Sequence, residues 1–571
     1  MKSNYTKQKK KKNKGLVIAL VSVLILAFGA AVAYIIITNE NNNRIMNNST
    51  ALKGVTVNGI DISGMSADEA RQATSSVPSD LLSAINISFT ADGQSFTYTG
   101  EQLGIATDYE DVLNEALAFG NTGSLEQRKQ AIEQAKTQGV AFTVTTHTDR
   151  EQIASVLLPL KAGLDKLPTD AVCTFTPWGH TADGTAYVQD QQAMIEATAS
   201  GKQWERPELV RVPDAEMPNK LRYKYWNNDK YVADYQPDDA NISRFVYTEG
   251  TDGISVNMES VIDSVMSQLE SGNYSEITAP TEPIKPAVSV EDLKKNTQLI
   301  ASWTSSYSRH NSFNRNWNVA KLSGIVNGVT IQPDEIWSIN DTAGVRTLSG
   351  GWKAASGIVD GGYVDQPGGG VCQISSTTYN AAIRAALDIK DATHHSIPSD
   401  YIPFGLDATI SSGSPDLKIR NPYATPVYLV SYVDPAKKTS TVEVYGPIVD
   451  DPNYGAVIRD FSFEDLGTFG EPVMNYVYNS TKARDGRVLA QGESYEYAKA
   501  RPGRKVKTYI HYYSLDGTQV DVKEFHSYTW NPKNGTTYVN GPDPATLPPA
   551  TTPAVPETSV TDPAVPEAPV Q

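Results

Sequence analysis

Cysteine is almost absent from the sequence, with Cys173 and Cys372 the two examples among 571 residues. Two cysteines are too few for a disulfide framework or for a zinc site built from cysteines. A bridge between them is an alternative outside the cell, but a chain of this length buries enough core without one. The local sequences favour separate roles, with Cys173 a small apolar residue inside a strand.

Acidic residues are missing from residues 1–14, which carry seven lysines. Residues 15–37 follow without a charge, and a helix of that length, rising about 1.5 Å per residue, crosses a lipid bilayer. Because basic flanks stay inside, the pattern predicts a cytoplasmic tail, a single transmembrane helix and an extracellular C-terminus in a monoderm-type envelope. A cleaved signal peptide is the alternative, because Ala31-Val32-Ala33 resembles a cleavage site, although the apolar run is longer than usual.

Basic residues are scarce beyond the anchor. The N-terminal tail accounts for seven lysines. The rest of the chain therefore carries 42 of the 49 Lys and Arg residues and all 65 Asp and Glu residues, a formal charge of −23. This balance argues against nucleic acid as a partner. A sortase-type signal and a second apolar run are also lacking, and residues 542–571 are mostly Pro, Ala, Thr, Val and Glu. We expect this tail to be a disordered spacer.

The remaining length predicts an α+β multidomain ectodomain with a β-rich C-terminal module. Residues 38–50 are Asn-rich and read as a stalk. Within residues 51–285, Ser66 and Glu69 form a capping box, residues 109–136 are helical with a break at 119–123, and Pro280 to Pro286 is a linker.

Four segments carry a resemblance within this region: Leu103-Gly104, Gly120 to Gly123, Pro168 to Phe175 and Gly253 to Asn257. Together they resemble a YoaR-like peptidoglycan-binding domain. Residues near 180–250 are longer and more polar than that pattern, so we expect an insertion there, whose role is open.

The region 290–435, termed the cysteine domain, carries a set of motifs that resembles the VanW family. They are Asn318 to Leu322, Ile325 to Gly328, Pro333 to Ser338, Gly368 to Ser376, His395 to Pro398, Gly405 to Thr409 and Asp416 to Asn421. The resemblance implies a cell-envelope protein, first named in vancomycin resistance of the B type. It supplies no reaction, because the family's biochemical activity is not established.

Cys372 follows Gly368, Gly369 and Gly370, and apolar residues then recur at helical spacing. Cys372 is therefore predicted at a helix start, where the helix dipole and free amides favour a thiolate nucleophile. The glycines would let a substrate or a backbone come close. We expect these glycines, Gln373 and Arg420 to contribute to binding.

A thiolate needs a base and a group that orients the base. His395 and Asp407 follow Cys372 in the residue order of papain-like and transglutaminase-like folds, on later β segments, an analogy of order alone. Acyl transfer or amide hydrolysis is the reaction suggested. Packing roles for all three residues are the competing interpretation. A metal site formed by His394, His395 and Cys372 is disfavoured by the spacing, and we predict no metal and no cofactor.

The module at 460–541 alternates like strands, and its glycines resemble the extracellular domain named for five glycines. Its aromatic residues either stack on wall sugars or form cross-strand core pairs: Tyr512, Tyr513, Tyr528 and Trp530. The leading hypothesis is a tethered envelope protein that binds peptidoglycan or its peptide stems. A Cys-His-Asp hydrolase or acyl transferase is the second, and an accessory role in glycopeptide resistance is the third.

Overall fold

The computed structural model describes residues 9–213, 220–232, 235–359 and 362–547. These residues form two compact units, one built from the described residues up to 169 together with 251–287, and the other from those within 170–250 and from 288 onward. Most of the predicted disordered tail and part of the predicted cytoplasmic tail lie outside the described residues.

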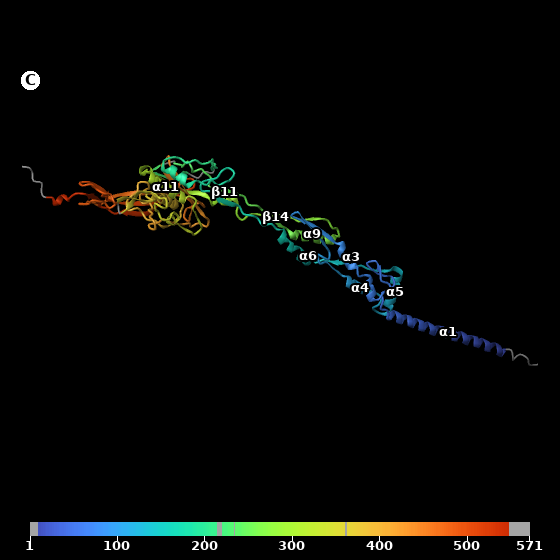
Figure 1. The fold of residues 1–571 in the computed structure, drawn as a ribbon. Helices are drawn as coiled ribbons and strands as arrows, with labels where there is room; N and C mark the ends of the chain where they lie inside the picture. Colours follow the sequence, from blue (N-terminus) through green and yellow to red (C-terminus); the bar gives the residue numbers. More distant parts are fainter. Residues whose placement is uncertain (1–8, 214–219, 233–234, 360–361, 548–571) are drawn as a thin grey trace, which may run out of the picture. The chain divides into compact units, whose positions relative to one another are not determined.

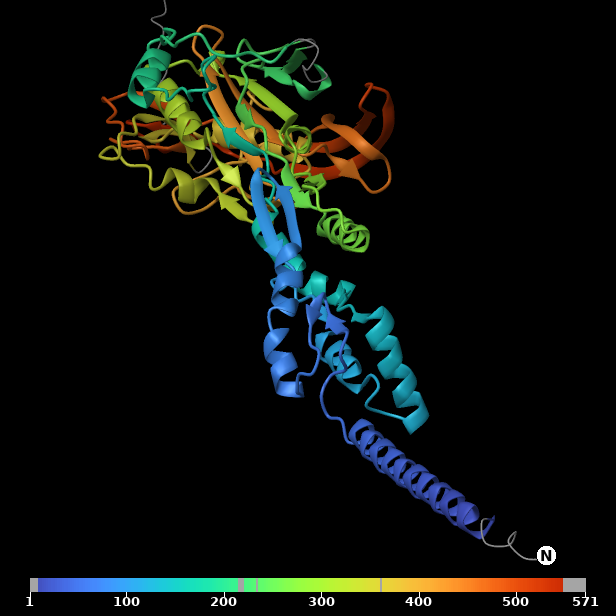
Figure 2. The same ribbon diagram turned by 90° about the vertical axis from the view of Figure 1, so that its right-hand side faces the viewer.

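The chain begins with a long helix, α1 (Lys9–Met46), drawn in dark blue in Figures 1 and 2. Within the described ranges, Gly15–Met46 is the one helix long and apolar enough to cross a membrane. The helix continues past residue 37, so most of the predicted stalk is helical. Arg128 Nη1 donates to the carbonyls of Ile45 and Met46 at 3.3 and 2.9 Å and so satisfies the end of the helix.

The first unit has two hydrophobic cores. The core nearer α1 in sequence joins a small sheet to helices, namely β1 (Val55–Val57), β2 (Ile60–Asp61), β6 (Val140–Phe142), α2 (Ala67–Ala73), α3 (Val77–Ala84), α4 (Tyr109–Ala118) and α5 (Leu125–Gln138). The capping box of Ser66 and Glu69 is present as predicted. The predicted helix 109–136 is confirmed as two helices, α4 and α5, separated at the expected break.

The second core of this unit uses further strands and helices. They are β3 (Asn86–Ala91), β4 (Gln94–Thr99), β5 (Ala106–Thr107), β7 (Thr146–His147), β12 (Gly253–Val256), β13 (Ile277–Thr278), β14 (Thr281–Ile284), α6 (Arg150–Leu157), η1 (Leu158–Leu160), α7 (Lys161–Leu164) and α9 (Met258–Ser271). The predicted linker Pro280 to Pro286 differs from expectation, because β14 pairs with β12. A strand at a sheet edge tolerates the prolines that suggested a linker.

The second unit is built on a six-stranded sheet of order β10-β9-β15-β23-β22-β16. Its members are β9 (Tyr225–Asn227), β10 (Lys230–Val232), β15 (Gln298–Ser306), β16 (Thr330–Ile331), β22 (Val427–Asp434) and β23 (Thr439–Gly446). Strands β9 and β10 come from the predicted insertion, as does α8 (Gln191–Ala199). Met194 of α8 is 1% exposed in the same core as α11. The insertion therefore completes the cysteine domain's fold.

The remaining elements of the cysteine domain surround this sheet. They are β8 (Val172–Phe175), β11 (Phe245–Thr248), α10 (Val290–Lys295), α11 (Phe313–Val326), α12 (Ile339–Ala343), α13 (Cys372–Arg384), β17 (Ile336–Ser338), β18 (Ala354–Val359), β19 (Gly362–Pro367), β20 (Asp388–Asp391) and β21 (Lys418–Arg420), with the 3-10 turns η3 (Lys220–Arg222) and η4 (Ser308–His310). Residues Gln373 to Arg384 of α13 are buried. Cys173 and Cys372 are both free thiols.

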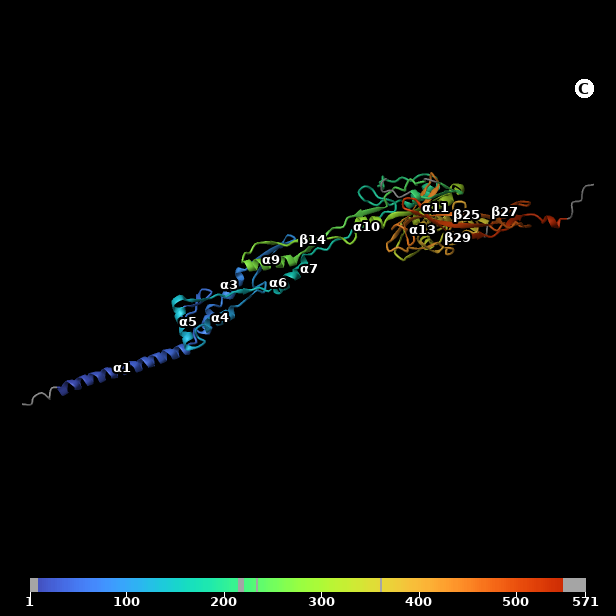
Figure 3. The ribbon, with the colours of Figure 1, turned by 180° about the vertical axis from the view of Figure 1, so that it is seen from behind.

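The C-terminal strands, drawn in orange and red in Figure 3, belong to the same unit as the cysteine domain. One sheet has the order β24-β25-β28-β29 and the other β26-β30-β27, formed by β24 (Asp450–Asp451), β25 (Gly455–Phe469), β26 (Met474–Val477), β27 (Ser494–Ala498), β28 (Gly503–Ser514), β29 (Gln519–Trp530) and β30 (Gly535–Val539), before η5 (Pro544–Thr546). Phe461 and Ile510 share the hydrophobic core of α13. Tyr512 and Trp530 are 9% and 5% exposed, which favours core packing over sugar stacking for these two aromatics.

Candidate active site

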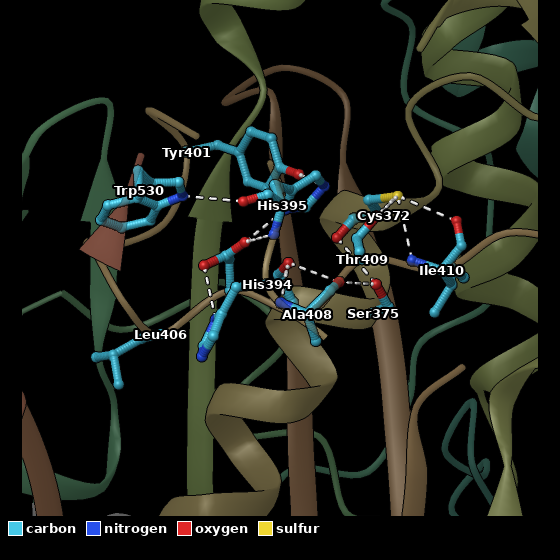
Figure 4. Close-up of polar contacts among 12 residues, drawn as sticks. Cys372, Ser375, His394, His395, Tyr401, Leu406, Ala408, Thr409, Ile410 and Trp530 are labelled. Atoms are coloured by element: carbon cyan, nitrogen blue, oxygen red, sulfur yellow. Dashed lines mark hydrogen bonds and ion pairs between the residues drawn. The ribbon is translucent and has the colours of Figure 1, made fainter. Parts of the chain in front are cut away.

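Cys372 is the first residue of α13, and its N-cap Val371 makes no side-chain capping bond. The thiol is half-buried. Its Sγ accepts a hydrogen bond from the Ile410 amide at 3.5 Å and lies 3.5 Å from Thr409 Oγ1 (Figure 4). The start of a helix and a neighbouring amide both favour negative charge on this sulfur.

His395 and Asp407 lie in the irregular segment between β20 and β21, whose two arms are joined by a bridge between Thr393 and Thr409. Neither residue lies in a regular strand, so the analogy with papain-like and transglutaminase-like folds stays one of residue order. Asp407 Oδ2 accepts from both the His395 amide and Nδ1 at 2.6 Å, while Oδ1 lies 3.0 Å from His394 Nδ1. The structure brings Cys372 and His395 together (Figure 4), and Asp407 binds the His395 ring.

The first turn of α13 fixes this arrangement. The Ser375 and Ser376 hydroxyls donate to the Ala408 carbonyl at 2.5 and 3.1 Å, and the Ala408 amide donates to Ser376 Oγ at 3.0 Å. Ala408 lies between Asp407 and the thiol-contacting Thr409. Ser375 and Ser376 thereby position residues 407–409, a segment that contacts both His395 and the Cys372 thiol.

Two aromatic residues complete the surroundings of His395, which is 5% exposed. Trp530 Nε1 donates to the His395 carbonyl at 2.9 Å, and the Tyr401 hydroxyl lies 3.4 Å from Nε2. Trp530 belongs to β29, so the C-terminal strands take part in building this site.

The electrostatics favour an ion pair. Burial raises the pKa of the Cys372 thiol, but the hydrogen bond and charge of His395, with Thr409 and the Ile410 amide, lower it overall to about 7. Burial opposes a charged His395, yet Tyr401, Asp407 and Cys372 raise its pKa well above 6.5. Asp407 is buried too, and its hydrogen bonds to His394 and His395 hold the pKa of its carboxyl below the usual range. A thiolate beside an imidazolium is the expected state near neutral pH.

The three glycines before Cys372 each face a close neighbour. A Cβ on Gly369 would lie 1.9 Å from the Ala355 carbonyl oxygen, and one on Gly370 would lie 2.6 Å from Arg315 Cγ. Gly368 has a φ of +81° and faces the stem of Arg346 at 3.1 Å. These contacts explain the glycines by the close approach of the protein's own backbone and two arginines.

The other predicted binding residues have internal partners. Gln373 is fully buried, with Oε1 accepting from Arg315 at 2.7 Å and Nε2 donating to Ser305 Oγ at 3.1 Å. Arg420 pairs with Asp388 at 2.7 Å and with Asp334 at 2.5 Å. Neither pattern brings these side chains to the thiol, so their predicted role in binding stays a prediction.

Sequence reasoning missed Arg315, Arg346, Tyr401 and Trp530. The first two gave no sign because a lone arginine on a helix or loop is ordinarily a solvated charge. The predicted absence of a metal is untested by a structure without ligands. Across the described ranges, no group of three or more His, Cys, Asp and Glu residues is placed to hold one.

Residues 314–445 match the family model described as "VanW like protein". The chain contains a VanW-like domain. This domain carries Cys372, His395 and Asp407, and the resemblance seen in the sequence is confirmed. Residues 96–178 match the model described as "Putative peptidoglycan binding domain". The two matches support a cell-wall-related function.

Two curated proteins resemble parts of the chain. The "Uncharacterized protein YoaR" of Bacillus subtilis is 35% identical over 27% of this chain and 51% of its own length. The "Vancomycin B-type resistance protein VanW" of Enterococcus faecalis is 26% identical over 33% of this chain and 60% of its own length. The chain thus spans about half of the first and three-fifths of the second.

Two solved structures of G5 domains also match. HP0197-G5 is 17% identical over 15% of this chain and 95% of its own, with a TM-score of 0.09. The G5 domain of an IgA1 protease is 15% identical over 16% of this chain and 95% of its own, with a TM-score of 0.10.

Proposed function

We propose that the chain is a membrane-anchored envelope protein whose VanW-like domain is a cysteine-dependent acyl transferase or amidase acting on wall peptides. The observation that carries the proposal is the pair of hydrogen bonds by which Asp407 holds His395 beside Cys372. His395, Thr409 and the Ile410 amide together lower the pKa of that thiol to about 7. A buried thiol kept for packing alone would gain nothing from such a partner.

The chemistry follows the geometry. The Cys372 thiolate attacks an amide carbonyl carbon, a C–S bond forms, the C–N bond breaks, and His395 gives its proton to the leaving amine. Water, or an amine in the transferase case, then attacks the thioester. His395 takes the proton of that nucleophile, and the thiolate is released. Asp407 stays ionised and stabilises the imidazolium.

The location of the substrate is part of the proposal. The apolar segment 15–37 of α1 supports a single span of the cell membrane, with the lysine-rich end cytoplasmic and the C-terminus extracellular. The match of residues 96–178 supports binding to peptidoglycan close to the membrane. A tether of this kind limits the enzyme to the inner wall.

The test uses the full chain in detergent, incubated with stem peptides released from purified peptidoglycan. Mass spectrometry should find a cleaved or transferred product that Cys372→Ser abolishes and Cys173→Ala retains. Cys173 is a matched control, because burial raises the pKa of its thiol to about 11. Equal product from the wild type and Cys372→Ser, with an ordinary thiol pKa near 8.5, would exclude the enzyme.

Peptidoglycan binding is tested separately from catalysis. The full-length Cys372→Ser chain should sediment with isolated peptidoglycan, since binding through residues 96–178 does not use the thiol. Recovery of the protein in the supernatant, at the level of a chain lacking residues 96–178, would contradict binding.

A further inference from the structure

Arg315 is a buried cation beside the Cys372 thiol, and the proposed reaction gives this arginine no role. It is the third residue of α11 and is 7% exposed. Its stem packs over Gly370, and its Nη2 donates to Gln373 Oε1 at 2.7 Å. Because Gly370 lies two residues before Cys372 and Gln373 directly after it, the guanidinium lies beside the start of α13.

The Arg315 guanidinium also lies close to the proposed base, His395, because Tyr401 is a neighbour of both residues. The Arg315 Cζ lies 5.9 Å from the centroid of the Tyr401 ring, and the Tyr401 hydroxyl lies 3.4 Å from His395 Nε2. Arg315 is therefore bordered by groups that adjoin both the nucleophile and the histidine.

One nitrogen of Arg315 lacks an acceptor. Within the described part of the chain, Nη1 is buried without a hydrogen-bond partner. Asp400, whose charge also acts on Arg315, is paired instead with His310 at 2.9 Å and Arg309 at 3.7 Å. A guanidinium is always charged, and a buried charged donor without an acceptor is unfavourable. An acceptor supplied by a ligand would remove that penalty.

A second arginine packs over another glycine of the same segment. Arg346 is 7% exposed, its stem packs over Gly368, and its Nη2 donates to Asn340 Oδ1 at 2.9 Å. Its amide donates to Ser412 Oγ at 3.1 Å, two residues beyond the Ile410 amide that donates to the thiol.

We propose that Arg315, supported by Arg346, forms a subsite for a free carboxylate of the substrate, next to the carbonyl that Cys372 attacks. The inference rests on the proposed function and narrows its substrate class to peptides with a free carboxylate on the residue beside the scissile amide. Arginine suits this role, because its planar fork binds a carboxylate through two parallel hydrogen bonds.

Two alkylating reagents of nearly equal size test the subsite on the full chain. Each loses iodide to the thiolate and forms a thioether, but iodoacetate carries a carboxylate and iodoacetamide a neutral amide. Peptide-resolved mass spectrometry gives the ratio of the iodoacetate to the iodoacetamide rate at Cys372. We expect this ratio to exceed that of 2-mercaptoethanol in the same buffer by about tenfold. A ratio equal to that of the free thiol would overturn the subsite.

Variants assign the effect to the arginine. Arg315→Gln should return the ratio to the free-thiol value. Because both reagents react with the same thiolate, the ratio cancels any change in the fraction of Cys372 that is ionised. Arg487→Gln is the matched control and should keep the raised ratio, because Arg487 pairs with Glu493 at 3.1 Å. An unchanged ratio in Arg315→Gln would contradict the assignment.

A competition in the unmutated protein guards against misfolding of the Arg315 variant. N-acetylalanine should slow iodoacetamide at Cys372, and its uncharged amide should not. Equal effects of the two would overturn the subsite. If Cys372 reacts with iodoacetamide faster than a free thiol but the iodoacetate-to-iodoacetamide ratio equals that of the free thiol, the carboxylate subsite alone is contradicted. If the iodoacetamide rate equals that of a free thiol but the ratio is raised, the proposed enzyme alone is contradicted.

Discussion

Asp407 Oδ2 accepts two hydrogen bonds from His395, one from the backbone amide and one from Nδ1, each 2.6 Å long. An ionised carboxylate can only accept, so Nδ1 carries a proton in the imidazolium and in the neutral ring alike, and Nε2, beside Tyr401, is the nitrogen that gains or loses one. The backbone bond fixes the position of the residue and the side-chain bond fixes its ring. One acid therefore sets both the tautomer and the orientation of the base.

Asp407→Asn should weaken the thiolate. A neutral amide no longer stabilises the imidazolium, so the pKa of His395 falls and that of Cys372 rises from about 7 toward 9.0. We expect the pH profile of iodoacetamide alkylation to move upward by about one to two units. Because the folded protein depresses the pKa of Asp407, its stabilisation is present at neutral pH and lost in acid.

The control for that variant is Asp460→Asn. Asp460 is another acid held by cations, pairing with Arg384 at 3.1 Å and Lys224 at 2.8 Å. Both variants should lower the free energy of unfolding, by about 1–3 kcal/mol, while the alkylation profile should move in Asp407→Asn alone. An unchanged profile in Asp407→Asn would remove the acid from the proposed mechanism.

His395→Asn and His394→Asn separate two histidines that share Asp407. Burial raises the pKa of Cys372 once His395 is gone, so alkylation at pH 7 should fall by about tenfold or more. His394 bonds Asp407 Oδ1 at 3.0 Å and contacts the ring of Tyr528, so its loss should change the rate by less than about threefold. The measurement is the iodoacetamide rate of each variant at pH 7. Equal losses of rate in the two variants would contradict the assignment of the base to His395 rather than His394.

Local features of the site were predictable from the sequence. The spacing after Gly370 indicated a helix beginning at Cys372, and the capping box of Ser66 and Glu69 indicated α2. Both are properties of neighbouring residues, which propensity and periodicity describe. The order of cysteine, histidine and acid was also visible.

The contacts that join distant segments were not predictable. Alternation in β28 and β29 indicated strands, but it does not say that Trp530 faces His395 rather than solvent. Strand β9 joins β15 in parallel across some eighty residues, and nothing local in the polar insertion marks that pairing. Arg315 was hidden for the same reason, because its meaning depends on Tyr401 and Gln373.

Trp530→Phe should weaken the positioning of His395 and keep the aromatic packing. The ring stays, but the Nε1–H that donates to the His395 carbonyl at 2.9 Å is lost. We expect the free energy of unfolding to fall by about 1 kcal/mol, with a decrease in the iodoacetamide rate at Cys372. Tyr528→Phe is the matched control, since it keeps the ring that contacts His394 and Trp530. Identical rates in both variants would show that β29 only supports the fold.

Gly369→Ala should disturb the fold and the site together. The new Cβ would lie 1.9 Å from the Ala355 carbonyl oxygen, and backbone cannot rotate away as a flexible side chain can. Strand β18 or the start of α13 must move, at a cost of about 1–3 kcal/mol or more, and movement of α13 takes Cys372 away from His395.

Gly413→Ala isolates backbone strain from this clash. Gly413 has a φ of +91° and no atom within 4 Å of an added Cβ, so its variant pays about 1–2 kcal/mol for conformation alone. In Gly369→Ala, both the free energy of unfolding, measured with denaturant, and the iodoacetamide rate at Cys372 should fall. In Gly413→Ala, the free energy of unfolding alone should fall. If Gly369→Ala kept a fast thiol, the close approach of Ala355 would not be what positions Cys372, and the glycines would have to be explained by the two arginines that pack over them.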